Sequence, residues 1–71
     1  MEKLVLRVDG MSCEHYVRAI TNAVGALPGI SRVTVDLNGK TVTVEYDEAQ
    51  STPGIIKDEI EDQGYDVAYI G

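Results

Sequence analysis

The sequence predicts an α+β fold in which two helices cover one face of a four-stranded antiparallel sheet. Segments with an apolar period of two alternate with segments whose period is three to four, in the order strand, helix, strand, strand, helix, strand. This order divides into two strand-helix-strand halves of roughly thirty residues. The halves meet at Asn38-Gly39, a dipeptide typical of a hairpin turn. Packing both helices on one face of the sheet buries both of their apolar stripes.

The first half begins with the alternating segment LVLRV, which puts Leu4, Leu6 and Val8 on one face of a strand. From Glu14 the apolar residues instead recur at spacings of three and four, which predicts an amphipathic helix that ends at Pro28-Gly29. The members of this stripe are Val17, Ile20, Val24 and Leu27.

The central hairpin is predicted from two alternating segments, VTVDL and TVTVEY. The residues expected to face the core are Val33, Val35 and Leu37 in the first, and Val42, Val44 and Tyr46 in the second. The two strands are joined at Asn38-Gly39, and this dipeptide favours a tight type I′ turn.

The second helix is predicted with Thr52 as its N-cap, Pro53 at its first position and Gly64 as its end. Ile56 and Ile60 form its inner stripe.

The tail YDVAYI reads as the last strand, with either Val67 and Tyr69 or Ala68 and Ile70 toward the core. The complete pattern predicts one domain over residues 1–71, a ferredoxin-like βαββαβ sandwich.

Composition limits the functions that the chain can have. Six Lys and Arg against twelve Asp and Glu give a net charge of -6, so we expect no nucleic-acid partner. A single Cys cannot form an internal disulfide, which favours a reducing compartment, the cytoplasm. The segment MEKLVLRVDG lacks the apolar run of a signal peptide, and we expect no membrane span.

The segment GMSCEHYVRAI carries the candidate site. It places Cys13 at or just before the start of the first helix, where unpaired N–H groups and the helix dipole stabilise a thiolate. A thiolate is a ligand that soft metal ions prefer. Gly10 lets the chain fold back, and we expect Met11 to anchor the loop on the core rather than to bind metal.

This segment resembles the GMTCxxC loop of heavy-metal-associated (HMA) domains, which include copper chaperones and the N-terminal modules of copper-transporting ATPases. The resemblance extends to the Pro28-Gly29-Ile30 turn, the hairpin strands and IEDQGYDV near the end of the chain. It implies a domain that holds Cu(I) between two thiolates and passes it by ligand exchange to a partner such as a copper-transporting ATPase. The first thiolate corresponds to Cys13, and the position of the second is occupied by Tyr16.

A phenol is a poor ligand for Cu(I), because its pKa is about 10 and Cu(I) prefers sulfur. Three groups are candidates to complete the site: His15 of the same chain, Cys13 of a second chain, or a small thiol such as glutathione. On a helix, His15 points about 200° around the axis from Cys13, which disfavours chelation within one chain. We therefore expect a metal-bridged homodimer with His15 as a candidate additional ligand, and Ag(I) or Zn(II) as alternatives to Cu(I).

Tyr65 and Tyr16 are expected near the metal without binding it. Tyr16 is interpreted as an aromatic that packs over Cys13, and Tyr65 as part of a loop that approaches the metal loop.

Two other interpretations remain open. The chain is either an HMA-fold interaction or dimerisation domain that has lost metal binding, or an otherwise complete site into which Tyr16 was introduced. An enzyme is not expected, because Cys13 has no orienting base or oxyanion hole in the sequence pattern.

Overall fold

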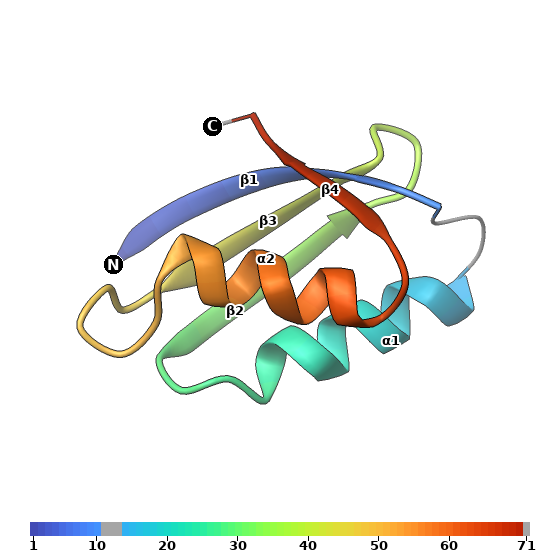
Figure 1. Ribbon diagram of the computed structural model, residues 1–71. Helices are drawn as coiled ribbons and strands as arrows, with labels where there is room; N and C mark the ends of the chain where they lie inside the picture. The colour runs from blue at the N-terminus through green and yellow to red at the C-terminus, as the bar shows by residue number, and fades with distance from the viewer. Residues whose placement is uncertain (11–13, 71) are drawn as a thin grey trace.

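The computed structural model describes residues 1–10 and 14–70 and contains the predicted elements in the predicted order (Figure 1). The strands are β1 (Glu2–Asp9), β2 (Ile30–Asp36), β3 (Thr41–Tyr46) and β4 (Asp66–Tyr69), and the helices are α1 (Glu14–Gly25) and α2 (Pro53–Asp62). The sheet order is β2-β3-β1-β4, and each neighbouring pair is antiparallel. The predicted ferredoxin-like βαββαβ fold is confirmed.

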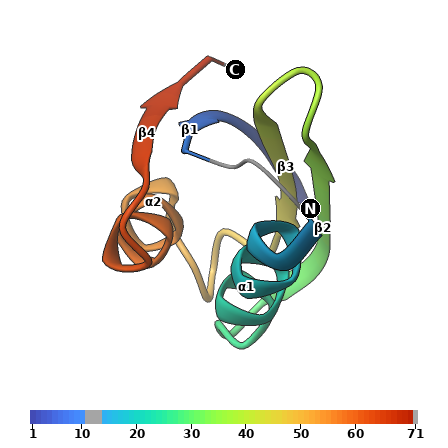
Figure 2. The same cartoon turned by 90° about the vertical axis from the view of Figure 1, so that its right-hand side faces the viewer.

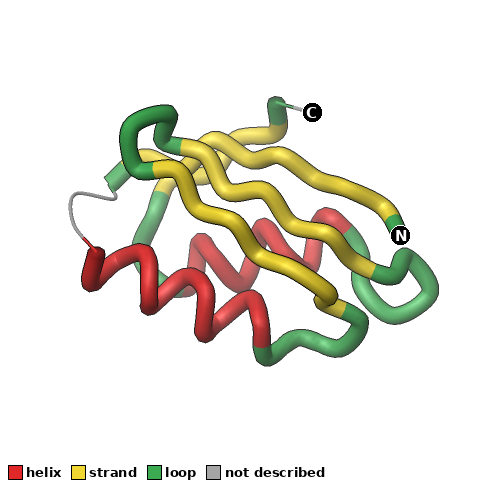
Figure 3. Tube along the Cα trace, turned by 180° about the vertical axis from the view of Figure 1, so that it is seen from behind, coloured by secondary structure: helices red, strands yellow, loops and turns green. Residues whose placement is uncertain are grey.

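Both helices lie on one face of the sheet, as predicted. An end-on view shows α1 and α2 next to each other on the same side of the strands (Figure 2). Viewed from behind, the strands lie in front and the helices behind them (Figure 3). The opposite face of the sheet is therefore not covered by any helix of the described residues. Within residues 1–10 and 14–70, no helix has the length and apolar character needed to cross a bilayer.

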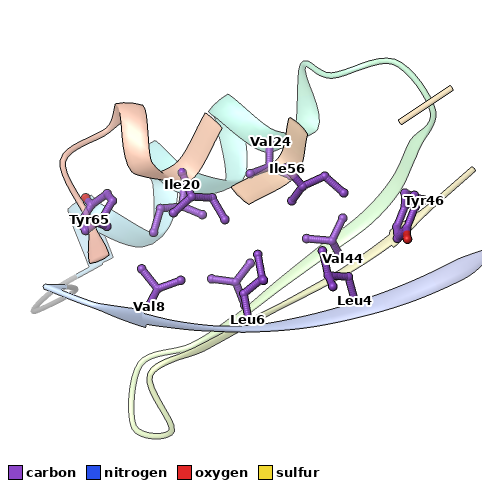
Figure 4. Packing of buried hydrophobic residues seen from close by; sticks show 11 residues of the cluster. Leu4, Leu6, Val8, Ile20, Val24, Val44, Tyr46, Ile56 and Tyr65 are labelled. Carbon is purple, nitrogen blue, oxygen red and sulfur yellow. The ribbon is translucent and has the colours of Figure 1, made fainter. Parts of the chain in front are cut away.

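The core fills the space between the sheet and the helices (Figure 4). Its buried apolar residues are Leu4, Leu6, Val8, Ile20, Val24, Val42, Val44, Tyr46, Ile56, Ile60 and Tyr65. These include the predicted inner faces of β1, β3 and α2. Each fully buried aliphatic side chain contributes about 1.5–3 kcal/mol relative to exposure. The inner residues of the edge strand β2, Val33 and Val35, are half-buried and pack against this core.

The predicted stripe of α1 is confirmed at its centre and weaker at its ends. Ile20 and Val24 are fully buried, whereas Val17 is half-buried. The helix ends at Gly25, before the predicted Pro28-Gly29, and Leu27 packs against the core from the following turn.

The structure shows which side chains of β4 point toward the core. Val67 is half-buried against the core, and Ala68 and Ile70 are exposed. Tyr69 is 51% exposed, and Lys57 Nζ of α2 lies 5.8 Å from its ring centroid. Of the two predicted alternatives, the one with Val67 inward is therefore correct.

The predicted type I′ turn is wrong. β2 ends at Asp36, which pairs with Thr41, so the loop has four residues, from Leu37 to Lys40. A type I′ turn needs positive φ at both central residues, but in this loop only Lys40 has one, at 56°. The Asp36 carboxylate accepts a 3.1 Å hydrogen bond from the Gly39 N–H, a local bond that competes with the tight turn.

Gly39 lies outside the left-handed region, so its φ does not favour glycine, but a side chain here would displace the Asp36 carboxylate. A Cβ at this position would lie 2.9 Å from Asp36 Oδ2. Leu37, predicted as the last strand residue, lies in the loop but still packs against the core.

The predicted ends of α2 are confirmed. Thr52 Oγ1 accepts a 3.3 Å hydrogen bond from the Ile55 N–H, and Pro53 is the first helical residue. Gly64 follows the helix with φ of 95°, a conformation in which glycine is preferred after a helix C-terminus.

Hydrogen bonds connect the loop between β3 and α2 to the turn before β2. The Asp47 N–H donates to the Gly29 carbonyl at 2.8 Å, and the buried Ser51 hydroxyl donates to the Pro28 carbonyl at 2.5 Å. The Asp47 carboxylate accepts hydrogen bonds from the Gln50 side chain and from the Ala49 N–H, and these bonds lower the pKa of Asp47. Residues 47–51 are thereby fixed against the turn that precedes β2.

Substitutions at three glycines separate two causes of lost stability, backbone strain at positive φ and crowding of the new Cβ. Gly29 has φ of 78°, and a Cβ there would lie 2.6 Å from the Gln50 Cβ. Gly64 has φ of 95° with no atom within 4 Å of such a Cβ, and Gly25, which lies outside the left-handed region, is equally open. We predict that Gly29→Ala is the most destabilising, by about 2 kcal/mol or more, from strain and overlap together.

Gly64→Ala should cost about 1 kcal/mol from strain alone, and Gly25→Ala should be neutral or stabilising by about 0.5 kcal/mol. Chemical denaturation of the three variants measures these values. If Gly29→Ala were as stable as Gly64→Ala, the predicted overlap between a Cβ at position 29 and the Gln50 Cβ would be wrong.

Candidate metal site

The candidate site lies where β1 ends and α1 begins. β1 ends at Asp9, and the first described residue of α1 is Glu14, which follows Cys13 in the sequence. The predicted ligand Cys13 and the predicted loop anchor Met11 are outside the described residues. The described residues around this segment are Gly10 on its N-terminal side and His15 and Tyr16 on its C-terminal side. Tyr65, from the α2–β4 connection, lies next to them.

Tyr65 packs directly against Gly10. A Cβ on Gly10 would lie 3.3 Å from Tyr65 Cδ1, and Gly10 has φ of 102°. Both the conformation and the close approach of the ring therefore favour glycine at this position. The Tyr65 side chain is buried, with 9% of its surface exposed. Sequence reasoning predicted that the loop with Tyr65 approaches the metal loop. The structure brings Tyr65 to Gly10, and its predicted place near the metal stays a prediction.

Tyr65 also contacts Tyr16 on the other side of the segment. Their ring centroids are 5.8 Å apart with an interplanar angle of 89°, an edge-to-face pair. Such pairs contribute about 0.5–1.5 kcal/mol beyond the burial of area. The half-buried Tyr16 is thus a packing aromatic in this structure. Its predicted position over Cys13 is outside the described residues.

His15 is the outermost of the three rings. Its side chain is exposed, and its ring centroid lies 5.9 Å from that of Tyr16 at 75°. The imidazole is therefore open to solvent and to a second molecule. Its predicted role as an additional metal ligand stays a prediction.

The sheet fixes the end of β1, just before the segment. The Val8 N–H donates to the Lys40 carbonyl at 2.8 Å, and Asp9 pairs with Asp66 across the β1–β4 ladder. Asp9 and Asp66 are both exposed, so two carboxylates stand opposite each other beside the segment. Arg7 Nε lies 3.6 Å from Asp9 Oδ1, so the guanidinium offsets part of this negative charge. An exposed ion pair of this kind contributes only about 0–1 kcal/mol to stability.

Sequence reasoning missed the Asp9–Asp66 pair, because it depends on a strand register that periodicity does not give. Apart from residues 11–13 and 71, the chain has no cluster of three or more His, Cys, Asp or Glu side chains arranged to hold a metal ion.

Comparisons with a family model, with related sequences and with solved structures agree on one family. The model of the heavy-metal-associated domain matches residues 5–66. The copper chaperone CopZ of Bacillus subtilis is 48% identical over 68 residues, which cover 96% of this chain and 99% of the relative. That relative is named a chaperone and not an enzyme, in agreement with the predicted absence of enzymatic activity.

Two solved structures share the fold over the whole length of the chain. The yeast copper transporter domain Ccc2a, studied in apo and Cu(I)-loaded states, has a TM-score of 0.94 and 30% identity, and the alignment covers 100% of this chain and 97% of that domain. A copper-binding domain from HMA7, a P-type ATPase, has a TM-score of 0.96 and 27% identity over 100% of this chain and 96% of that domain.

The Tyr16–Tyr65 contact predicts a measurable coupling. In a double-mutant cycle of Tyr16→Leu and Tyr65→Leu, the two losses of unfolding free energy should be non-additive by about 0.5–1.5 kcal/mol, because either change alone removes the same ring contact. Chemical denaturation provides the values. The control cycle pairs Tyr65→Leu with Tyr46→Leu, since Tyr46 lies at the other end of the core (Figure 4), and it should be additive. Equal coupling in both cycles would contradict the assignment.

Proposed function

The chain belongs to the heavy-metal-associated domain family, and from this premise we propose that it binds Cu(I) through Cys13 and transfers the ion to a partner protein. The observation that supports the proposal is the place of Cys13 in the sequence, immediately before Glu14, the first described residue of α1. The names of the relatives support copper as the cargo. Ag(I) and Zn(II) are further candidates only because they also bind thiolates.

The chemistry of the position suits a soft cation. The first N–H groups of a helix have no partner within the helix, and the helix dipole adds positive potential at this end. Both effects stabilise a thiolate, and Cu(I) prefers sulfur ligands. Because a new Cu–S bond forms as the old one breaks, with no change in the oxidation state of copper or sulfur, the ion can pass to a second thiol-bearing site.

The site is completed by a second molecule. Tyr16 stands where the family motif has its second cysteine, and its ring packs against Tyr65. A phenol oxygen is a weak ligand for Cu(I), which prefers sulfur. The second sulfur then comes from Cys13 of another copy, which gives a metal-bridged homodimer, or from a small thiol such as glutathione. The exposed His15 is open to an ion held between two copies.

The partner that we propose is a metal-binding domain of a copper-transporting ATPase. The similarity to the HMA7 and Ccc2a domains supports this choice, because it implies the same scaffold on both sides of the exchange. In this proposal residues 1–71 act as one domain in the cytoplasm, where reducing conditions keep Cys13 free.

A second candidate function is supported by Tyr16. If this residue has replaced an essential ligand, the domain serves as an interaction or dimerisation module on the same scaffold and binds no metal. The edge-to-face packing of Tyr16 on Tyr65 is compatible with this function, because it uses the ring for stability. Metal titration separates the two candidates.

Cu(I) titration under reducing conditions, with the mass measured at each step, tests the proposal. The wild-type chain should bind Cu(I) and form a species of two chains per ion, and Cys13→Ser should abolish binding because it removes the sulfur. His15→Ala should retain the binding and weaken it at most moderately. Unchanged binding by Cys13→Ser would refute the proposal, and the absence of binding by the wild-type chain would favour the interaction module.

Tyr16→Cys tests the proposed reason for the dimer. A second thiol three residues after Cys13 lies on the same side of the first helical turn. This variant should therefore bind one Cu(I) per chain as a monomer and more tightly than the wild type. Tyr16→Phe is the matched control, which keeps the ring and adds no sulfur, and it should remain at two chains per ion. A Tyr16→Cys variant that still needs two chains would contradict this account.

A further inference from the structure

We propose that Asn38 is a site of spontaneous deamidation, and that the hydrogen bond from Gly39 to Asp36 slows this reaction in the folded protein. Asn38 and Gly39 lie in the loop between β2 and β3, which extends beyond the sheet in Figure 1. The loop does not form the tight turn that this pair of residues favours. The reaction involves no metal ion and is independent of the proposed function.

The reaction joins two groups that are neighbours in the chain. The Gly39 backbone nitrogen loses its proton and attacks Cγ, the side-chain carbonyl carbon of Asn38. A bond between Gly39 N and Asn38 Cγ forms as the bond between Cγ and Nδ2 breaks, and Nδ2 takes up a proton through water and leaves as ammonia. Water then opens the cyclic imide at either carbonyl, which gives aspartate or isoaspartate. No atom changes its oxidation state, and water is the only co-reactant.

The folded loop leaves both reacting groups accessible. The residues Asn38, Gly39 and Lys40 are all exposed, so water reaches them. Gly39 has no Cβ, so no side chain of its own hinders the approach of its nitrogen to Asn38. The loop therefore provides the water and the unhindered nitrogen that deamidation needs.

The Asp36 carboxylate opposes the first step. The Gly39 N–H donates to Asp36 Oδ1 at 3.1 Å, and a Cβ at position 39 would lie 2.9 Å from Oδ2, so the whole carboxylate is close to this nitrogen. A hydrogen bond to the protonated form of a group and a neighbouring negative charge both disfavour its ionisation. The hydrogen bond is also lost when the nitrogen gives up its proton, which raises the barrier further.

Asn22 provides a comparison within the same molecule. It is the other asparagine of the chain, and its side chain is exposed like that of Asn38. Asn22 and the following Ala23 both lie inside α1, where backbone N–H groups donate to carbonyls four residues earlier. A methyl group on Ala23 also hinders attack by its nitrogen. We therefore expect Asn22 to remain intact while the protein is folded.

Deamidation changes the loop in two ways. It places a new negative charge two residues after Asp36, in a chain whose net charge is already -6. Isoaspartate also inserts a methylene into the main chain before Gly39. Lys40 follows with φ of 56°, and its carbonyl accepts the 2.8 Å hydrogen bond from the Val8 N–H of β1. The isoaspartate product should therefore unfold at a lower denaturant concentration than the unmodified protein.

Peptide mapping by mass spectrometry tests the proposal after incubation of the full chain at mildly alkaline pH. The folded wild type should convert Asn38 to aspartate and isoaspartate and leave Asn22 intact. Asp36→Ala should accelerate the conversion about two- to tenfold, the factor to which the loss of one hydrogen bond corresponds. Thr34→Ala is the matched control, because it removes another exposed polar side chain of β2 and leaves the bond to Gly39 in place. Its rate should equal that of wild type.

The same incubation in denaturant shows whether the folded loop is responsible for the difference. In the unfolded chain Asp36 no longer holds Gly39, so wild type and Asp36→Ala should convert Asn38 at equal rates, and faster than the folded wild type. Chemical denaturation beforehand shows that each variant folds.

Three results would overturn the proposal. The site would be refuted if Asn38 stayed intact in folded wild type and in folded Asp36→Ala while the unfolded chain converted it. The role of Asp36 would be refuted if folded Asp36→Ala reacted no faster than wild type. An equal acceleration at Asn22 in Asp36→Ala would also refute it, because general opening of the fold would then explain the rate.

Discussion

The structure depends on burying one face of a four-stranded sheet under two helices. The inner residues of β1 and β3 are almost completely removed from water, and Ile20, Val24, Ile56 and Ile60 cover them from the helices. The chain has one cysteine, so no internal disulfide contributes to this stability. In a domain of this size the apolar core has to provide most of the stabilisation. The loops can then differ in composition, provided that the two layers remain packed.

The two ends of this sandwich are held in different ways. At the end with the β3–α2 loop, hydrogen bonds from Asp47 and Ser51 fix the turn before β2. At the end with the Cys13 segment, the described contacts are mainly aromatic, because Tyr65 packs on Gly10 and Tyr16. The buried Tyr65 ring closes the core at this end, beside Gly10 and Tyr16.

Most of the fold could be predicted from the sequence, because burial imposes a period on each element. The alternation in LVLRV and TVTVEY and the spacing of Ile56 and Ile60 each identified the buried face. Thr52, Pro53 and Gly64 also marked the ends of α2, since capping depends on local chemistry. The turn at Asn38-Gly39 was predicted wrongly, because the Asp36 carboxylate bonds to Gly39 and stabilises a longer loop. For the site, the sequence indicated Cys13 and His15 as candidate ligands, and these stay predictions.

By itself the sequence determined which residues are buried, where the helices begin and which atom is the candidate ligand, because these follow from periodicity, capping and the chemistry of single side chains. Only the tertiary structure decided which face of β4 is inward, that Asp9 stands opposite Asp66, and that Tyr65 meets both Gly10 and Tyr16. These contacts join residues far apart in the chain. They depend on strand register and on the packing of helices against the sheet, which no local pattern specifies.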